Sequence, residues 1–186
     1  MAFFFVTAEC LILVGVFDGF SWIRAEGKGS FLSSPQIKSF GNERIAAGEK
    51  ILVVDLENCG GMDSTFMGTL AGLAARLSAR DGGLLQIADA NSRNQTSLED
   101  LGLDFLMEID PLESIWREKV DLIRSELIPR NSSPQGEIQQ VRHVLEAHQI
   151  LSETSDKNGE IFSAVVRVLE SNLAEKKRLA DDQESI

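Results

Sequence analysis

The sequence has few of the residues that build covalent or metal-based sites. Only two cysteines, Cys10 and Cys59, occur among 186 residues, and they form no C-x-x-C pair. Single cysteines in apolar surroundings are typical of small buried side chains, so no disulfide framework is predicted. The two histidines, His143 and His148, lie five positions apart with no cysteine nearby, which does not indicate a metal site. We therefore expect neither a metal nor a cofactor.

Basic residues are also scarce relative to acidic ones. The chain has 18 Lys and Arg against 29 Asp and Glu, which gives a formal net charge of −11 at pH 7 and a pI near 4.6. Binding to phosphate backbones requires clustered Lys and Arg, so this balance argues against a nucleic-acid-binding protein. An acidic surface is compatible with a cytoplasmic protein that binds other proteins.

No apolar run is long enough to predict a membrane span. The N-terminal stretch MAFFFVTAECLILVGVF contains Glu9 and meets Asp18 before it reaches the roughly 20 apolar residues that a span requires. It also lacks the basic segment and the A-x-A-like cleavage site of a signal peptide. We expect strand material here. A membrane anchor, or upstream sequence included by a misplaced start, are the alternatives.

The residues that are present predict an α/β domain. Apolar residues make up 43% of the chain, with a mean hydropathy of −0.05, which is enough to form a hydrophobic core. Up to residue 110, runs typical of strands alternate with helical patterns. The expected strands lie at 11–16, 21–25, 50–56, 84–90 and 107–110, and the expected helices at 34–48, 64–79 and 97–106. This alternation predicts crossover connections and a partly parallel sheet.

Beyond residue 110 the pattern becomes helical. Apolar residues recur at helical spacing over 112–127, 138–151 and 161–169, and the turn-rich segment PRNSSPQG at 129–136 is typical of a linker. We therefore predict one domain over 1–110 and a helical extension over 111–186, whose charged end frays from about residue 175. The apolar faces of the extension are expected to fold back on the sheet, and pairing with another chain is the alternative.

The candidate site lies in the stretch CGGMDSTFMGTLAGLAARL, residues 59–77. A strand, a Gly-Gly turn and a helix that begins near Ser64 bring unpaired backbone N–H groups to one exposed point, which favours anions. One interpretation is that Asp63 only caps the helix, accepting from the amide of Thr65 or Phe66. The other is that Ser64 accepts a phosphate, whose charge of about −1.5 to −2 would repel a partner lying over this point.

Catalytic motifs are missing around this serine. Ser64 stands in M-D-S-T-F instead of a G-x-S-x-G nucleophile elbow, and both histidines fall in the predicted extension. The Gly-Lys-Ser/Thr ending of a phosphate loop is also absent. Asp55, Asp63 and Asp89 can meet at strand ends, where α/β sheets bind ligands, but no base or metal-ligand spacing accompanies them. We therefore expect no enzymatic activity.

Two segments resemble the STAS domain, a family named for sulfate transporters and anti-sigma factor antagonists. The segment ILVVDLENCGGMDSTFMGTLAGLAARL is similar to the family's central strand, its D-S-[ST] turn and the helix that follows. The segment GGLLQIADANSRNQTSLEDLGLDFLMEI is similar to its closing helix and strand. The resemblance covers roughly residues 10–110. It implies a small mixed β-sheet with helices packed mainly on one side, followed in this chain by an all-α C-terminal extension.

The resemblance also implies a function. In the anti-anti-sigma members, a partner serine kinase that is also the anti-sigma factor phosphorylates the serine after the turn's aspartate. Only the unphosphorylated form binds that kinase, and a serine phosphatase resets the cycle. By position, the phosphoacceptor is Ser64, with Thr65 as a second candidate. The implied partner surface consists of Gly60, Gly61, Met62, Asp63, Phe66 and Met67. These properties describe a cytoplasmic bacterial regulator that controls transcription.

The chain departs from the family pattern in three places. Phe66, Met67 and Gly68 stand where members often have Gly-Leu-Gly, and the bulky Phe66 can crowd the kinase or form a different partner surface. Residues 27–30 replace a Gly-x-Leu-Asp pattern, so an aspartate near the switch is missing. The helical extension is the third departure. It leaves an alternative function: a stressosome-like or transport-complex scaffold that assembles as a homo-oligomer through its tail, without phosphorylation.

Overall fold

The computed structural model describes residues 10–184. Most of the N-terminal apolar stretch, residues 1–9, therefore lies outside the described residues, and its last part forms the first strand, β1 (Leu11–Phe17). None of the helices that the structure describes is both long and apolar enough to cross a membrane.

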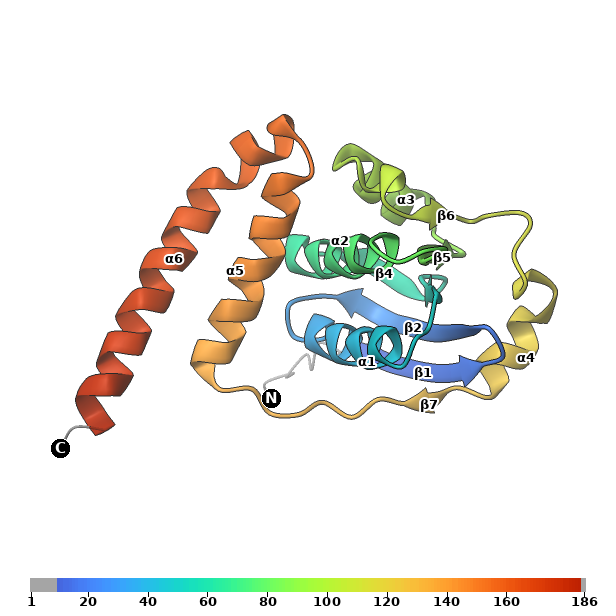
Figure 1. Cartoon of the computed structure of the whole chain (residues 1–186), viewed down its shortest axis with the longest axis horizontal. Helices are drawn as coiled ribbons and strands as arrows, with labels where there is room; N and C mark the ends of the chain where they lie inside the picture. Colours follow the sequence, from blue (N-terminus) through green and yellow to red (C-terminus); the bar gives the residue numbers. More distant parts are fainter. Residues whose placement is uncertain (1–9, 185–186) are drawn as a thin grey trace, which may run out of the picture.

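A mixed sheet of seven strands forms the centre of the molecule (Figure 1). The strand order is β6-β5-β3-β2-β1-β7, and β4 pairs with β2 outside this path. β1 and β2 form an antiparallel hairpin around Gly19, whose φ of +83° is readily adopted by glycine. β2, β3, β5 and β6 are parallel to one another. The remaining strands are β2 (Phe20–Gly29), β3 (Ile51–Asp55), β4 (Cys59–Met62), β5 (Leu84–Ala88), β6 (Glu108–Ile109) and β7 (Ile128–Pro129). The predicted mixed α/β fold is confirmed.

Two short strands differ from the sequence-based expectation. The Gly-Gly segment, expected to be a flexible turn, forms β4, because its backbone pairs in parallel with the end of β2 at Gly27, Lys28 and Gly29. The segment expected to begin a linker contains β7, which pairs with β1 at the edge of the sheet. Both pairings depend on residues far apart in the chain, so no local pattern indicates them.

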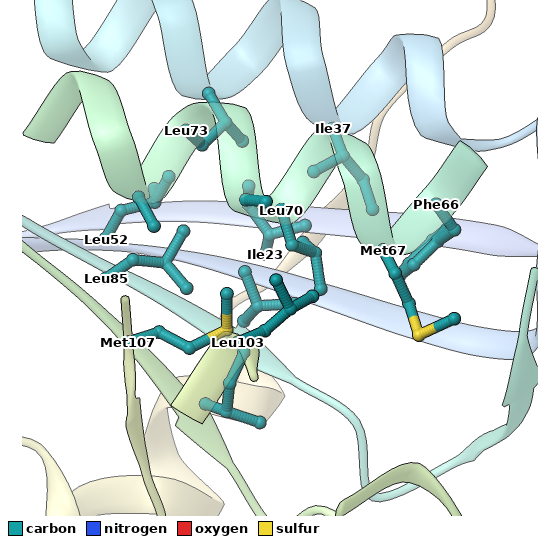
Figure 2. Close-up of a cluster of buried hydrophobic side chains, with 14 of the residues drawn as sticks. Ile23, Ile37, Leu52, Phe66, Met67, Leu70, Leu73, Leu85, Leu103 and Met107 are labelled. Carbon is teal, nitrogen blue, oxygen red and sulfur yellow. The ribbon is translucent and has the colours of Figure 1, made fainter. Parts of the chain in front are cut away.

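Helices cover one face of the sheet and enclose the main core (Figure 2). They are α1 (Ser34–Ala46), α2 (Ser64–Ser78) and α3 (Ser92–Asp100), followed by the 3-10 turn η1 (Leu103–Phe105). Leu70 and Leu73 of α2 lie toward the strand residues Leu52 and Leu85, and all four are at most 2% exposed. α3 begins five residues earlier than expected, because the Asn91 side chain caps it by accepting from the Asn94 amide.

The first part of the extension, residues 111–129, covers the opposite face of the sheet. This segment includes η2 (Arg117–Lys119), α4 (Val120–Ser125) and β7. Trp116 is fully buried, packs edge-on against Trp22 of β2 at 5.2 Å between ring centroids, and donates from Nε1 to Gln86 Oε1 at 2.7 Å. The sheet is therefore covered on both faces, as its continuous apolar strands require.

A buried ion-pair network joins this segment to the strand ends. Asp55, at the end of β3, is 0% exposed and accepts from Arg24 of β2 at 2.7 Å and from two nitrogens of Arg124 of α4 at 2.8 and 3.0 Å. Arg124 also reaches Asp89 at 2.6 Å. Asp55 and Asp89 thus meet at the strand ends as expected. Their carboxylate oxygens accept hydrogen bonds from arginines. Asp63 is not part of this network and caps α2 instead.

The second part of the extension is a helical hairpin on the helix layer. α5 (Glu137–Glu153) packs against α2, and α6 (Asp156–Glu184) runs antiparallel along the outer side of α5 (Figure 1). The hairpin does not fold back on the sheet itself, because α2 already covers that face and α5 packs on the outer side of α2. The charged end that was expected to fray continues as helix to Glu184.

Candidate functional site

The N-terminus of α2 is built around the side chain of Asp63. This residue has extended backbone angles, and its Oδ1 accepts from the Phe66 amide at 2.8 Å, which confirms the predicted N-cap. Its Oδ2 accepts from the Phe31 amide, also at 2.8 Å, so the same carboxylate holds the loop between β2 and α1. The cap therefore fixes the position of Ser64, the first residue of α2, relative to the sheet.

The hydroxyl of Ser64 is engaged by the extension. Ser64 Oγ lies 2.9 Å from Nε2 of His148 on α5, and His148 Nδ1 lies 2.8 Å from the Val144 carbonyl oxygen. Because a carbonyl only accepts, Nδ1 carries a proton, and in the neutral ring Nε2 accepts from the Ser64 hydroxyl. His148 is 6% exposed and packs edge-on against Phe162 of α6. Ser64 itself is half-buried.

A parallel contact occurs at α1. Nε2 of His143 lies 2.8 Å from the hydroxyl of Ser34, the first residue of α1, and His143 is also 6% exposed. Sequence reasoning placed both histidines away from the α/β core, whereas the structure brings each to the serine that opens a helix. In the sequence, the position of His148 on the apolar stripe of α5 predicts that its side chain is buried. It does not indicate which side chain the imidazole contacts.

The other predicted site residues divide by exposure. Gly60 is exposed, and Met62 and Asp63 are half-buried, so these three reach the surface beside Ser64. The remaining predicted residues are buried: Gly61, Thr65, Phe66 and Met67. Thr65 is 4% exposed, whereas Ser64 is half-buried.

Phe66 and Gly29 lie at two of the positions where the sequence departs from the family pattern, and they pack against each other. The Phe66 ring is 0% exposed and fills the space beside Gly29, where an added Cβ would lie 2.8 Å from the ring. A larger residue at position 29 would therefore require Phe66 to move. Phe66 belongs to the core instead of the outer surface, so it neither crowds a partner nor forms a contact surface while this packing holds.

Within the part of the chain that the structure describes, no group of three or more His, Cys, Asp or Glu side chains could hold a metal ion.

His143 is expected to make the docking of α5 sensitive to acid. Burial, together with the nearby charge of Lys38, lowers the pKa of His143 from 6.5 to about 4, although Glu146 acts in the opposite direction. Above pH 6.5 the ring is neutral in the docked and the released states. Between pH 6.5 and about 4 only the released ring binds a proton, so the free energy that holds α5 falls, by about 3 kcal/mol in total.

Hydrogen exchange of the α5 amides across this pH range measures the effect, after correction for the intrinsic exchange rate. The control is His143→Gln, which keeps a polar side chain near Ser34 but cannot titrate. Carboxylates also titrate near pH 4, so the prediction concerns the difference between the two proteins. Parallel pH profiles for the wild type and His143→Gln would contradict it.

Comparisons with known proteins agree on one family. Residues 12–114, more than half of the chain, match a family model described as the STAS domain. A search of curated proteins finds no match.

Solved structures share the fold. A candidate anti-sigma factor antagonist from Thermotoga maritima is 16% identical, with a TM-score of 0.50 over 60% of this chain and 92% of that chain. An anti-sigma factor antagonist from Mycobacterium paratuberculosis is 19% identical, with a TM-score of 0.50 over 62% of this chain and 95% of that chain. At these identities the likeness concerns the fold alone.

Proposed function

The chain belongs to the STAS domain family, and on this premise we propose that it is a regulatory protein-binding module, an anti-sigma factor antagonist with Ser64 as its phosphoacceptor. The observation that carries the proposal is the position of Ser64. It is the first residue of α2, directly after the capping aspartate, and the residue is half-buried. No catalytic activity of the chain is part of the proposal.

Physical chemistry supports a switch at this position. A phosphate on Ser64 would lie at a helix N-terminus, where backbone N–H groups and the helix dipole stabilise negative charge. The same phosphate would stand beside Asp63, whose carboxylate already binds the amides of Phe31 and Phe66. A partner that covers this point would meet two adjacent negative charges and would have to desolvate both, so its affinity would fall.

The proposed partner is a serine kinase that also acts as an anti-sigma factor, and a serine phosphatase would reset the switch. The contact surface would centre on the exposed and half-buried residues beside Ser64, namely Gly60, Met62 and Asp63. Thr65 is a weaker candidate for modification, because its side chain is buried. The circuit would operate in the bacterial cytoplasm, and neither nucleic acid nor membrane is a proposed partner.

Substitutions at Ser64 should separate the two states of the switch. Ser64→Asp is expected to abolish co-purification with the cognate serine kinase, because it places a fixed charge beside Asp63. Ser64→Ala is expected to retain binding and to lose phosphate incorporation from labelled ATP. Co-purification of the full-length variants, followed by mass mapping of the peptide that contains Ser64, measures both effects.

Ser92→Asp is the matched control for charge. Ser92 is likewise the first residue of a helix capped by the preceding side chain, but it is exposed on α3. It should bind the kinase as the wild type does. Equal binding by Ser64→Asp and Ser64→Ala would rule out the switch.

An exposed apolar stripe on α6 favours the scaffold as the second candidate. Ile161, Val165 and Val168 lie at helical spacing and are 41–67% exposed. In this alternative the tails of several copies pair, and the serine remains unmodified. Light scattering distinguishes the two candidates: a large complex that Val165→Glu disperses favours the scaffold, whereas a monomer favours the switch.

A further inference from the structure

We propose that α5 is an intramolecular cover for Ser64, so that docked α5 and a phosphate on Ser64 exclude each other. The inference rests on the proposed function for the identity of the modification, and it adds a regulatory role for the C-terminal hairpin. In the docked state the Ser64 hydroxyl is held by His148 and withheld from a kinase. Release of α5 would expose the serine and the face of α2 beside it.

The contact at Ser64 leaves no room for a phosphate. Its Oγ is at hydrogen-bond distance, 2.9 Å, from His148 Nε2, and a phosphoryl group cannot be inserted into such a gap. The imidazole is itself held by the Val144 carbonyl on one side and by the Phe162 ring on another, so it cannot simply turn away. A phosphate on Ser64 therefore requires α5 to move away from α2.

The phosphoryl transfer has the same requirement. As the bond between the γ-phosphorus of ATP and its bridging oxygen breaks, Ser64 Oγ forms the new O–P bond, ADP leaves, and the hydroxyl proton passes to a base of the kinase. In the docked state this hydrogen is directed at His148, and the helix that carries His148 stands where the kinase must approach. The docked form is therefore a poor substrate.

The cover extends along α2 beyond the serine. At Gly68 the two helices are so close that an added Cβ would lie 2.3 Å from the Ala147 carbonyl oxygen, and at Gly72 it would lie 2.8 Å from the end of Ile150. Small residues one turn apart thus allow the backbone of α5 to lie on α2. Any partner that uses this face of α2 must displace α5 first.

Polar contacts form part of the seam between α5 and the rest of the domain, beside the buried apolar side chains of Ala147 and Leu151. His143 contacts Ser34, and Lys38 of α1 forms an ion pair with Glu146 at 2.6 Å. A cleft of about 560 Å³ lies along the seam between α1, α2 and α5, and its lining combines charged side chains such as Lys38 and Glu146 with apolar ones such as Leu73 and Ile150. Residues 130–136, which connect β7 to α5, contain no helix or strand, so the hairpin can move without unfolding the sheet.

Mutual exclusion makes the coupling reciprocal. If docked α5 makes the phosphorylated state of Ser64 less favourable at equilibrium, phosphate on Ser64 lowers the stability of docked α5 by the same free energy. Couplings between sites typically change such equilibria by about 5- to 150-fold. The effect on α5 can therefore be measured without the kinase.

The test installs phosphoserine at position 64 of the full chain during translation and follows amide hydrogen exchange. Exchange of the α5 amides, residues 137–153, is expected to accelerate by about 5- to 150-fold relative to the unmodified chain, while β3 and β5 stay protected. Phosphoserine at position 92 serves as the matched control and should leave α5 unchanged. Unchanged α5 protection with phosphoserine at 64 would overturn the inference, since the phosphate would then fit beneath docked α5.

A second arm separates this inference from the proposed function. Ala147→Glu places a charge at a position that is 2% exposed against α2, and should free α5 without any phosphate and raise the rate of phosphorylation by the kinase. If the kinase never modifies Ser64 but phosphoserine at 64 still releases α5, the cover stands and the proposed function fails. If the kinase modifies the wild type and Ala147→Glu at equal rates, the proposed function stands and the cover fails.

Discussion

Replacing Asp55 by alanine is expected to lower the free energy of unfolding by about 3–5 kcal/mol. The carboxylate is completely buried and accepts hydrogen bonds from Arg24 of β2, Arg124 of α4 and the indole of Trp22. Its removal leaves two guanidinium groups close together without the charge between them. The measurement is urea unfolding at equilibrium, in which the midpoint falls while the slope shows whether the transition stays two-state.

Glu57→Ala is the matched control, because Glu57 pairs with the same two arginines at 2.8 and 2.9 Å but its side chain is 44% exposed. Exposed pairs contribute only about 0–1 kcal/mol, so this variant should stay close to the wild type. Equal losses of unfolding free energy in the two variants would mean that the burial of Asp55 does not determine its contribution to stability. The result bears on the fold as well as on stability, since Arg124 ties residues 111–129 to the sheet.

The second large effect is expected at Gly68, where alanine should loosen α5. The added methyl group would lie 2.3 Å from the Ala147 carbonyl oxygen, a backbone atom that cannot move without shifting α5. Overpacking of this kind costs about 1–3 kcal/mol. Hydrogen exchange of residues 137–153 should therefore accelerate, while α2 gains up to about 1 kcal/mol of helix propensity from the same substitution.

Gly72→Ala is the matched control one turn along the same helix. Its methyl group would meet only the flexible end of Ile150, at 2.8 Å, so a rotamer change can relieve the contact. Both variants gain the same helix propensity. The difference between their α5 exchange rates therefore reports on the contact with the α5 backbone alone. Similar exchange rates for α5 in the two variants would contradict the close approach at Gly68.

Local sequence features predicted the elements whose stability is local. The apolar run of β3 and the cap at Asp63 each depend on neighbours within a few residues, and the structure contains both. The structure differs from the sequence pattern at Asn91, whose side chain caps α3, and in β4 and β7, which are strands only because a distant strand pairs with each. Two- to four-residue strands carry too little pattern to be recognised alone.

The sequence by itself determined the mixed α/β fold, the family and the position of Ser64 at a capped helix start, because these follow from periodicity, turn chemistry and a contiguous motif. Only the tertiary structure decided what covers that serine. His148 lies 84 positions away, and its contact with Ser64 depends on α5 crossing α2 at Gly68. Such a crossing is set by the shapes of two helix surfaces, and the spacing of residues along either helix does not specify which surfaces meet.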